Sequence, residues 1–218
     1  MSIIIFDLDG TLMNTLDDLH NSVIHAMSTE GLPPLPKSDT RRYLGNGAKN
    51  LVYKSVEHVS PNAPEQQKAR VLDAFRLHYA EHSMDNTGPY EGIMQMLKEC
   101  KNRGYITAIV SNKPDFAVKD LHKAFFADYI DIAIGETPEV NRKPAPDMVD
   151  EAIRQLSHLH GRAISKSECV YVGDSEVDIA TARNSGLPCI AVSWGFRDKD
   201  WLIECGAEHI IDHPQELL

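Results

Sequence analysis

Residues 3–11 read Ile3-Ile4-Ile5-Phe6-Asp7-Leu8-Asp9-Gly10-Thr11. The apolar part, residues 3–6, is too short for a helix and suits a strand that is buried on both faces. Two carboxylates and a glycine follow it at once. Ligands of parallel sheets bind beyond the carboxyl ends of the strands, so this abrupt change indicates a buried parallel strand that ends at a functional loop.

Apolar runs of similar length recur along the rest of the chain. They occupy residues 105–110, 130–134, 169–172, 188–192 and 208–211. The helical patterns that alternate with them cover 91–103, 145–156 and 178–185. Alternation of strands and helices is typical of a parallel sheet covered by helices, so we expect an α/β fold, a Rossmann-like three-layer sandwich.

Residues 14–85 interrupt this alternation, because they contain helical patterns and no convincing strand. Helices are expected over about 15–30, 48–59 and 64–83, the first of them ending at Gly31 before a proline-rich turn. The sequence therefore predicts a core made of residues 1–13 and 86–218. It also predicts a small all-helical cap, residues 14–85, inserted after the first strand.

The composition excludes several classes of protein. The 218 residues are 42% hydrophobic and 25% charged, as in an ordinary soluble globular chain. The formal net charge of −10 would repel a nucleic-acid backbone, and no Lys/Arg-rich stretch offsets it. No run approaches the roughly 18 apolar residues of a membrane helix, and the apolar start lacks a basic leader. We expect neither a nucleic-acid nor a membrane partner, and a cytoplasmic location.

Polar side chains gather after four of the predicted strands. The four loops contain Asp7-Leu8-Asp9-Gly10-Thr11, Ser111-Asn112-Lys113, Arg142-Lys143-Pro144, and Gly173-Asp174-Ser175 with Asp178. Since parallel strands end at one edge of a sheet, these loops should form one rim. Phosphoryl transfer requires an oxygen nucleophile, a cation and fixed donors, and Mg²⁺ prefers oxygen ligands such as Asp7 and Asp174. The rim favours such a site over a merely solvated set of carboxylates.

Taken together, the four loops resemble the motifs of the haloacid dehalogenase superfamily, and within it the phosphoglycolate phosphatase group, over nearly the whole chain. The resemblance implies a phosphatase in which Asp7 attacks phosphorus to form an aspartyl-phosphate. Asp9 would protonate the leaving alcohol and then deprotonate the hydrolytic water. It also implies Mg²⁺ bound by Asp7, Asp174 and the backbone carbonyl of Asp9.

The resemblance implies phosphate-binding roles for four further residues, Thr11, Ser111, Asn112 and Lys143. The residue types alone leave alternatives open, because Thr11 also suits a helix cap and Ser111 a turn. Lys113 precedes Pro114 and could either approach the phosphate or face water.

Ser175 and Asp178, which follow the fourth predicted strand, are expected to support the site without binding the metal directly. Asp178 would orient a metal-bound water or Lys143. Ser175 and Asp178 are also three residues apart at a helix start, the spacing of a capping box. The two roles are compatible.

Within the expected cap, residues 42–48 resemble the substrate-facing glycine loop of the phosphoglycolate phosphatase group. The residues in or beside it that could contact the non-phosphate part of a substrate are Arg41, Arg42, Gly45, Asn46 and Gly47. The alternative is a flexible turn that opens the next helix. Position 14 carries Asn14 where many relatives carry Asp. The substitution removes a charge near the cap hinge, so the sequence does not predict the surroundings of this hinge.

The expected partner is a small phosphorylated metabolite, with 2-phosphoglycolate as the first candidate; oligomeric state is not predicted. Inorganic pyrophosphate and other sugar phosphates remain alternatives, as does phosphomutase activity. The cap histidine of the mutases would fall on Leu19, and His20 is displaced by one residue, about 100° round a helix. A hypothesis of another class is a catalytically silent binding module. Among the 10 histidines, His78 and His82 are helical neighbours, but Glu81 is wrongly placed for a zinc-protease motif.

Overall fold

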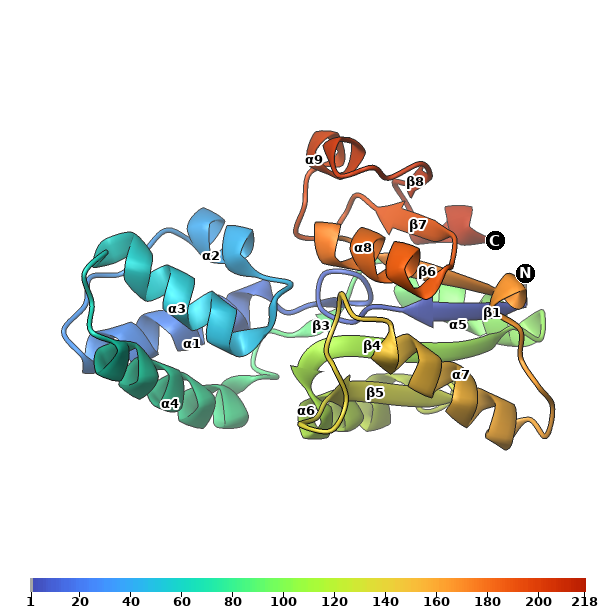
Figure 1. Cartoon of the computed structure of the whole chain (residues 1–218), viewed down its shortest axis with the longest axis horizontal. Coiled ribbons are helices and arrows are strands. Elements are labelled where there is room, and N and C mark those ends of the chain that lie inside the picture. The colour runs from blue at the N-terminus through green and yellow to red at the C-terminus, as the bar shows by residue number, and fades with distance from the viewer. Residues whose placement is uncertain (1) are drawn as a thin grey trace. The chain divides into compact units, whose positions relative to one another are not determined.

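The computed structural model describes residues 2–218, which divide into two compact units (Figure 1). The core unit consists of Met1–Met13 and Pro89–Leu218, and the helical unit consists of Asn14–Gly88. Where the chain passes between them, the two-residue strands β2 (Met13–Asn14) and β3 (Gly88–Pro89) pair with each other. Within the described residues, no helix is both long enough and apolar enough to cross a membrane.

The core unit is built on a parallel six-stranded sheet with the order β5-β4-β1-β6-β7-β8. The strands are β1 (Ile3–Phe6), β4 (Ile106–Pro114), β5 (Ile132–Glu136), β6 (Cys169–Gly173), β7 (Cys189–Val192) and β8 (Ile210–Ile211). β1 is central, with Ile3 paired to Ile106 on one side and to Cys169 on the other. All six apolar runs of the sequence form strands, and the predicted α/β fold is confirmed.

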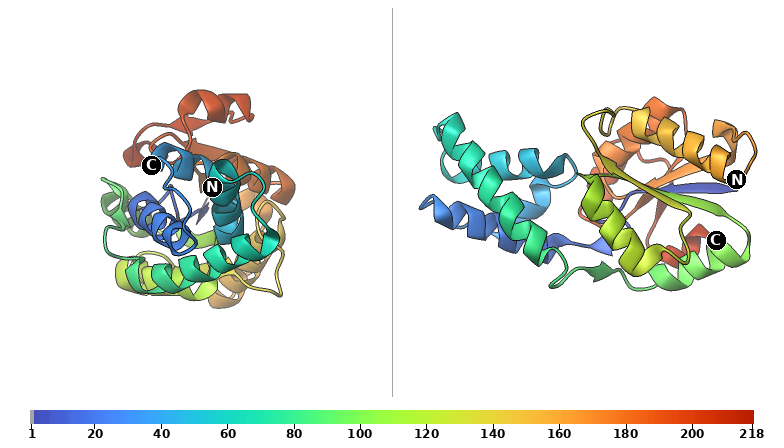
Figure 2. Two further views of the ribbon diagram at one scale, coloured as in Figure 1. Left: turned by 90° about the vertical axis from the view of Figure 1, so that its left-hand side faces the viewer. Right: turned by 90° about the horizontal axis from the view of Figure 1, so that it is seen from below.

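Alternate residues of β1 face two different helical layers. Ile4 and Phe6 pack in a cluster with α5 (Ile93–Asn102) and α6 (Asp115–Leu121). Ile3 and Ile5 pack in a second cluster with α7 (Asp147–Leu159) and α8 (Glu176–Ser185). Figure 2 shows the strands between these layers in its right-hand view. A strand covered on both faces must be apolar at every position, which explains the unbroken run at residues 3–6.

The helical unit contains α1 (Leu16–Thr29), α2 (Lys37–Tyr43), α3 (Gly47–Val59) and α4 (Glu65–His82). Its interior includes fully buried apolar side chains such as Val23 of α1 and Val71 of α4. The carboxylate of Asp18 accepts hydrogen bonds from the backbone N–H groups of Asn86 and Thr87, at 2.9–3.0 Å. These bonds outweigh the effect of burial and lower the pKa of Asp18. Asp18 thereby ties the last residues of the unit to its first helix.

The helical patterns identified from the sequence leave out three helices, α2 in the helical unit and α6 and α9 (Lys199–Glu204) in the core unit. All three have only six or seven residues, and α2 and α9 each bury a single side chain, Thr40 and Leu202. Helix prediction from sequence depends on a repeating apolar face, and one buried residue provides no repeat.

Candidate active site

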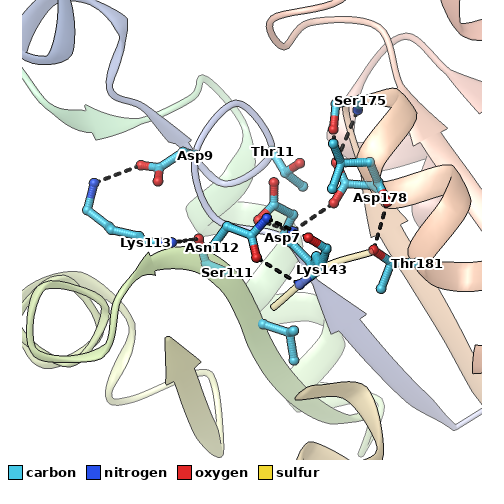
Figure 3. A network of polar contacts seen from close by, with 12 residues as sticks. Asp7, Asp9, Thr11, Ser111, Asn112, Lys113, Lys143, Ser175, Asp178 and Thr181 are labelled. Atoms are coloured by element: carbon cyan, nitrogen blue, oxygen red, sulfur yellow. Dashed lines mark hydrogen bonds and ion pairs between the residues drawn. The ribbon is translucent and has the colours of Figure 1, made fainter. Parts of the chain in front are cut away.

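The polar residues that follow β1 and β6, those in the last part of β4 and those of the loop before α7 lie together at the carboxyl edge of the sheet (Figure 3). Most of them are less than a tenth exposed: Asp7, Thr11, Ser111, Asn112, Lys113, Lys143, Asp174, Ser175 and Asp178. Asp9 is half-buried. The structure therefore brings together all the core residues that the sequence singles out.

The chain turns sharply as soon as β1 ends, as the spacing of the two carboxylates requires. The backbone N–H groups of Leu12 and Met13 both donate to the carbonyl of Leu8, at 3.0 and 2.9 Å. Gly10 has a φ of 92°, and a Cβ atom added to it would lie 2.4 Å from Oδ2 of Asp174. Only glycine fits here, because the turn is left-handed and presses against a carboxylate of another loop.

Lys143 is the centre of the site. Its Nζ lies 2.7 Å from Oδ1 of Asp7 and 2.8 Å from Oδ1 of Asp178 (Figure 3). It also lies 3.0 Å from the hydroxyl of Tyr171. The other oxygen of Asp178 accepts from the backbone N–H and hydroxyl of Ser175, at 3.1 and 2.6 Å. Asp178 thus forms the predicted capping box of α8 and contacts the lysine at the same time.

Burial makes the charges of this site depend strongly on one another. The pKa of Asp7 is raised well above its usual value, first by burial and then by Asp178, although Lys143 opposes the shift. Burial and then Asp178 raise the pKa of Asp174 to about 7, against the N–H of Phe196 and the hydroxyl of Thr11. Burial alone would lower the pKa of Lys143, but Asp178 and Asp7 raise it well above its usual value. One ammonium does not balance three buried carboxylates.

This excess of buried negative charge fits a divalent cation. Carboxylate oxygens of Asp7, Asp174 and Asp178 all lie within 4.8 Å of one another. Asp178 is engaged by the charged ammonium of Lys143 as well as by Ser175. Asp174 instead accepts from neutral donors, and no donor among the described residues contacts Oδ2 of Asp7. Oxygen-only ligands with one or two carboxylates are typical of Mg²⁺ sites, so Asp7 and Asp174 are the carboxylates that suit this ion.

Thr11 contacts Asp174 directly. Its hydroxyl donates to Oδ1 of Asp174 at 3.1 Å, and α1 begins only at Leu16. The alternative of a helix cap at Thr11 is therefore wrong. The threonine instead orients one of the carboxylates that suit the metal.

Ser111 and Asn112 end up in different surroundings although they are neighbours in β4. The hydroxyl of Ser111 accepts from the backbone N–H of Lys113 at 3.3 Å. The carboxamide of Asn112 accepts from the backbone N–H of Lys143 at 2.9 Å and donates to the carbonyl of Lys143 at 3.1 Å. This pair of bonds fixes the loop that carries Lys143, a role that sequence position did not reveal.

Lys113 does not face water. Its side chain is 3% exposed, and its Nζ lies 3.0 Å from Oδ1 of Asp9, whose side chain is 20% exposed. The site thus contains two separate lysine–carboxylate pairs, one at Asp7 and one at Asp9 (Figure 3).

The loop after β7 contributes to the site, and the sequence did not indicate this. The backbone N–H of Phe196 donates to Oδ2 of Asp174 at 2.7 Å, and the indole of Trp194 donates to the carbonyl of Thr11 at 2.9 Å. A Cβ atom on Gly195 would lie 2.3 Å from Cβ of Asp174. A glycine just beyond an apolar strand was the available signal, because such a residue permits close approach of two backbones.

Tyr171 is a second residue that the sequence did not indicate. It lies within β6, is fully buried, and its hydroxyl contacts Lys143 and also the carbonyl of Val110 at 3.3 Å. A tyrosine inside a strand covered on both faces needs a polar partner for its hydroxyl. That requirement could have drawn attention to it.

The candidate substrate-contacting residues of the helical unit lie where α2 ends and α3 begins. Gly45 and Gly47 have φ values of 101° and 75°, and Asn46 immediately precedes α3. The side chain of Arg42 is 72% exposed and lies 3.7 Å from Asp39. Asn14 accepts from the backbone N–H of Leu16 at 3.4 Å, at the start of α1.

Comparisons with known proteins show which family the chain resembles. The sequence model of the haloacid dehalogenase-like hydrolase family matches residues 4–192. Phosphoglycolate phosphatase of Mesorhizobium japonicum is 30% identical over 198 residues, which are 90% of this chain and 85% of the relative. N-acetylmuramic acid 6-phosphate phosphatase of Pseudomonas aeruginosa is 30% identical over 217 residues, 99% of this chain and 92% of the relative.

A solved structure gives the same picture of the fold. A crystal structure from Lactobacillus delbrueckii subsp. bulgaricus, described as that of a candidate phosphoglycolate phosphatase, superposes with a TM-score of 0.91 at 34% identity. The match covers 99% of this chain and 96% of that chain.

Proposed function

The chain belongs to the haloacid dehalogenase-like hydrolases, and from this we propose that it hydrolyses a small phosphomonoester through an aspartyl-phosphate on Asp7. The observation that carries the proposal is the 2.7 Å contact between Nζ of Lys143 and Oδ1 of Asp7 in a buried site. Burial alone favours a protonated carboxyl group, whereas the adjacent ammonium favours the charged, nucleophilic form. The same ammonium can bind an oxygen of the phosphate during transfer.

Asp9 is proposed as the general acid and base. It lies two residues after the nucleophile, directly before Gly10, and it is more exposed than Asp7. A carboxyl group in that position can give its proton to the leaving alcohol oxygen. The resulting carboxylate can then take a proton from the water that attacks the aspartyl-phosphate, so that the enzyme returns to its starting state.

Asp7, Asp174 and the backbone carbonyl of Asp9 are proposed as the protein ligands of Mg²⁺. Bound there, Mg²⁺ would supply the positive charge that offsets the phosphate and the buried carboxylates. Thr11 and the N–H of Phe196 support this assignment, because each donates to a different oxygen of Asp174 and thereby fixes its orientation.

The remaining residues are proposed to bind the phosphate or to hold the groups that do. Ser111 can donate its hydroxyl proton to a phosphate oxygen, while the carboxamide of Asn112 holds the backbone of Lys143 and so positions this lysine for the phosphate. Asp178, held by Ser175, keeps Lys143 in place. Thr11 is also proposed to bind the phosphate, for which its single hydroxyl proton, donated to Asp174 in this structure, would have to turn to a phosphate oxygen.

2-Phosphoglycolate is proposed as the first substrate to test, because phosphoglycolate phosphatases are among the relatives that align over most of the chain. N-acetylmuramic acid 6-phosphate is the second, since a phosphatase of that name aligns over 99% of the chain. Pyrophosphate hydrolysis and phosphomutase activity are further alternatives within the family.

The helical unit is proposed to act as the cap. Arg42, Gly45, Asn46 and Gly47 are the residues proposed to contact the substrate beyond its phosphate. They lie together at the turn between α2 and α3, and two of them are glycines with positive φ.

Substitution of the nucleophile tests the proposal. Asp7→Asn preserves the shape of the side chain and should reduce Mg²⁺-dependent turnover of an aryl phosphate by at least about 10³-fold. The thermal midpoint should stay the same or rise, because the raised pKa of Asp7 means that its charge destabilises the fold at neutral pH. The exposed Asp120→Asn, on α6, is the matched control and should retain full turnover. Comparable turnover by folded Asp7→Asn would exclude the covalent mechanism and leave a silent binding module or another activity.

A further inference from the structure

Lys113 is a buried cation that the chemistry at Asp7 does not use. Its side chain is 3% exposed, at the carboxyl end of β4, and its Nζ lies 3.0 Å from Oδ1 of Asp9. A lysine is seldom buried to this extent unless a charged partner holds it. Its partner is the carboxylate proposed above as the general acid.

The other cations near the site are engaged elsewhere. Lys143 lies between Asp7 and Asp178, at 2.7 and 2.8 Å. Arg197 makes two hydrogen bonds with the carboxylate of Glu176, at 2.7 and 2.9 Å. Lys113 differs from both because it contacts Asp9, the carboxylate proposed above to protonate the leaving group.

The distance to Asp9 determines what Lys113 can reach. A general acid must come within about 3 Å of the leaving oxygen to transfer its proton. Nζ of Lys113 is 3.0 Å from the same carboxylate. The ammonium therefore lies within about 6 Å of the leaving oxygen if Oδ1 of Asp9 transfers the proton, and within about 8 Å if Oδ2 does. A carboxylate on the carbon next to that oxygen falls within this range.

We propose that Lys113 determines specificity by binding a carboxylate of the leaving group, so that the preferred substrates are phosphate esters of 2-hydroxy acids. This inference rests on the proposed phosphatase function. The ammonium would share its hydrogen bonds between Asp9 and the substrate carboxylate, which draws the leaving oxygen toward the general acid. Because the lysine is buried, solvent screens this attraction only weakly. Sugar phosphates that have no carboxylate on the carbon next to the ester oxygen cannot make this contact.

A pair of substrates that differ only in the carboxylate tests the inference. 2-Phosphoglycolate and ethyl phosphate have the same ester oxygen and the same number of carbons, and their kcat/KM ratio measures recognition of the carboxylate. The wild-type protein should prefer 2-phosphoglycolate. Lys113→Met should reduce the ratio by about 10- to 100-fold, the value of one charge-assisted hydrogen bond. Lys113→Arg, which preserves the charge, should restore part of it.

Lys119→Met is the matched control, because Lys119 is an exposed lysine that pairs with Asp115 on the same unit. It should leave the ratio unchanged. Circular dichroism establishes whether each variant is folded, and the wild-type ratio by itself tests the inference if Lys113→Met does not fold. A wild-type ratio near one, or an equal ratio in folded Lys113→Met, would overturn the role of Lys113 while leaving the phosphatase intact. Hydrolysis of neither substrate, nor of any aryl phosphate, would overturn the proposed function itself.

Discussion

Each unit of the molecule holds a cluster of titratable side chains, and the two clusters have opposite surroundings. In the core unit, Lys143 lies within 2.8 Å of both Asp7 and Asp178, and all three are almost fully buried. In the helical unit, the ring of His78 stacks on those of His25 and His82, with centroids 4.1 and 4.3 Å apart. These histidines are exposed or half-buried.

The difference shows that neighbouring titratable groups form a reactive site only where water cannot screen the interactions between their charges. At the core cluster, burial and then Asp178 raise the pKa of Asp7 while Lys143 opposes the shift, so the protonation of Asp7 depends on its neighbours. At the histidine cluster an imidazole can avoid repulsion by releasing its proton to water. His78 is accordingly held neutral, since burial and then His25 and His82 lower its pKa, against Asp85 and Glu81.

Removal of the cation from the core cluster should have the largest effect on stability. Lys143→Met leaves Asp7 and Asp178 buried without their shared partner, and breaking a buried ion pair in this way destabilises a protein by about 3–5 kcal/mol. Urea unfolding followed by circular dichroism measures the change. The exposed pair of Lys119 and Asp115 provides the contrast, because Lys119→Met should change stability by less than about 1 kcal/mol.

A double variant shows how much of this loss of stability comes from the unpaired carboxylates and how much from packing. Adding Asp178→Asn to Lys143→Met removes one of the two stranded carboxylates and should recover a large part of the lost stability without restoring turnover. Lys143→Met alone could instead prove as stable as the wild type. Solvent would then weaken the repulsion between the buried carboxylates as effectively as it does between the histidines, and the contrast between the two clusters would be wrong.

The pH dependence of the core cluster should be the next largest effect. The folded pKa of Asp174, about 7, exceeds the value of 3.8 expected when the chain is unfolded. The folded chain therefore binds more protons in this range, and the stability that Asp174 contributes is lost as the pH rises toward and through 7. In chelator-treated protein, unfolding free energies at pH 5.5 and 7.5 should differ less for Asp174→Asn than for the wild type. Mg²⁺ should stabilise the wild type at pH 7.5 and leave Asp174→Asn unaffected.

The histidine cluster should show the smallest effect, with the opposite sign. The pKa of His78 is lowered on folding from its ordinary value of 6.5, so the unfolded chain takes up a proton more readily. The stability contributed by His78 is thus complete above pH 6.5 and lost as the pH falls below it. His78→Gln should weaken the loss of stability on acidification, as measured by urea unfolding at pH 7.5 and 5.5. His209→Gln, which changes an exposed histidine of the core unit, is the control. An identical response from both variants would show that the histidine stack does not cause the loss of stability on acidification.

Much of the core fold could be predicted because its signals are local. Each apolar run of four to six residues formed a strand, and the polar residues directly after those strands reached one edge of the sheet. α2 and α9 were missed because each buries one side chain and so shows no periodicity. The strand limits also shifted, since β4 continues to Pro114 and β5 begins at Ile132.

The residues that complete the site could not be predicted, because their roles depend on packing between distant segments. Tyr171 looks like any apolar strand residue until its hydroxyl is found beside Lys143. Asn112 resembles a phosphate donor until its carboxamide is found on the backbone of Lys143. Phe196 acts only through its backbone N–H, and no side-chain pattern reveals such a contact.

The order of the strands, the abrupt turn after Asp7 and the chemistry available at each loop could be predicted from the residues, since strand length, glycine placement and side-chain type act over a few positions. The pairing of the charged side chains could not be predicted in this way. Lys143 and Asp7 are 136 positions apart, and Lys113 and Asp9 are 104 apart, so which lysine meets which carboxylate depends on how the sheet and its loops pack. Burial, which sets the strength of those pairs, arises in the same step because it exists only when distant segments exclude water together.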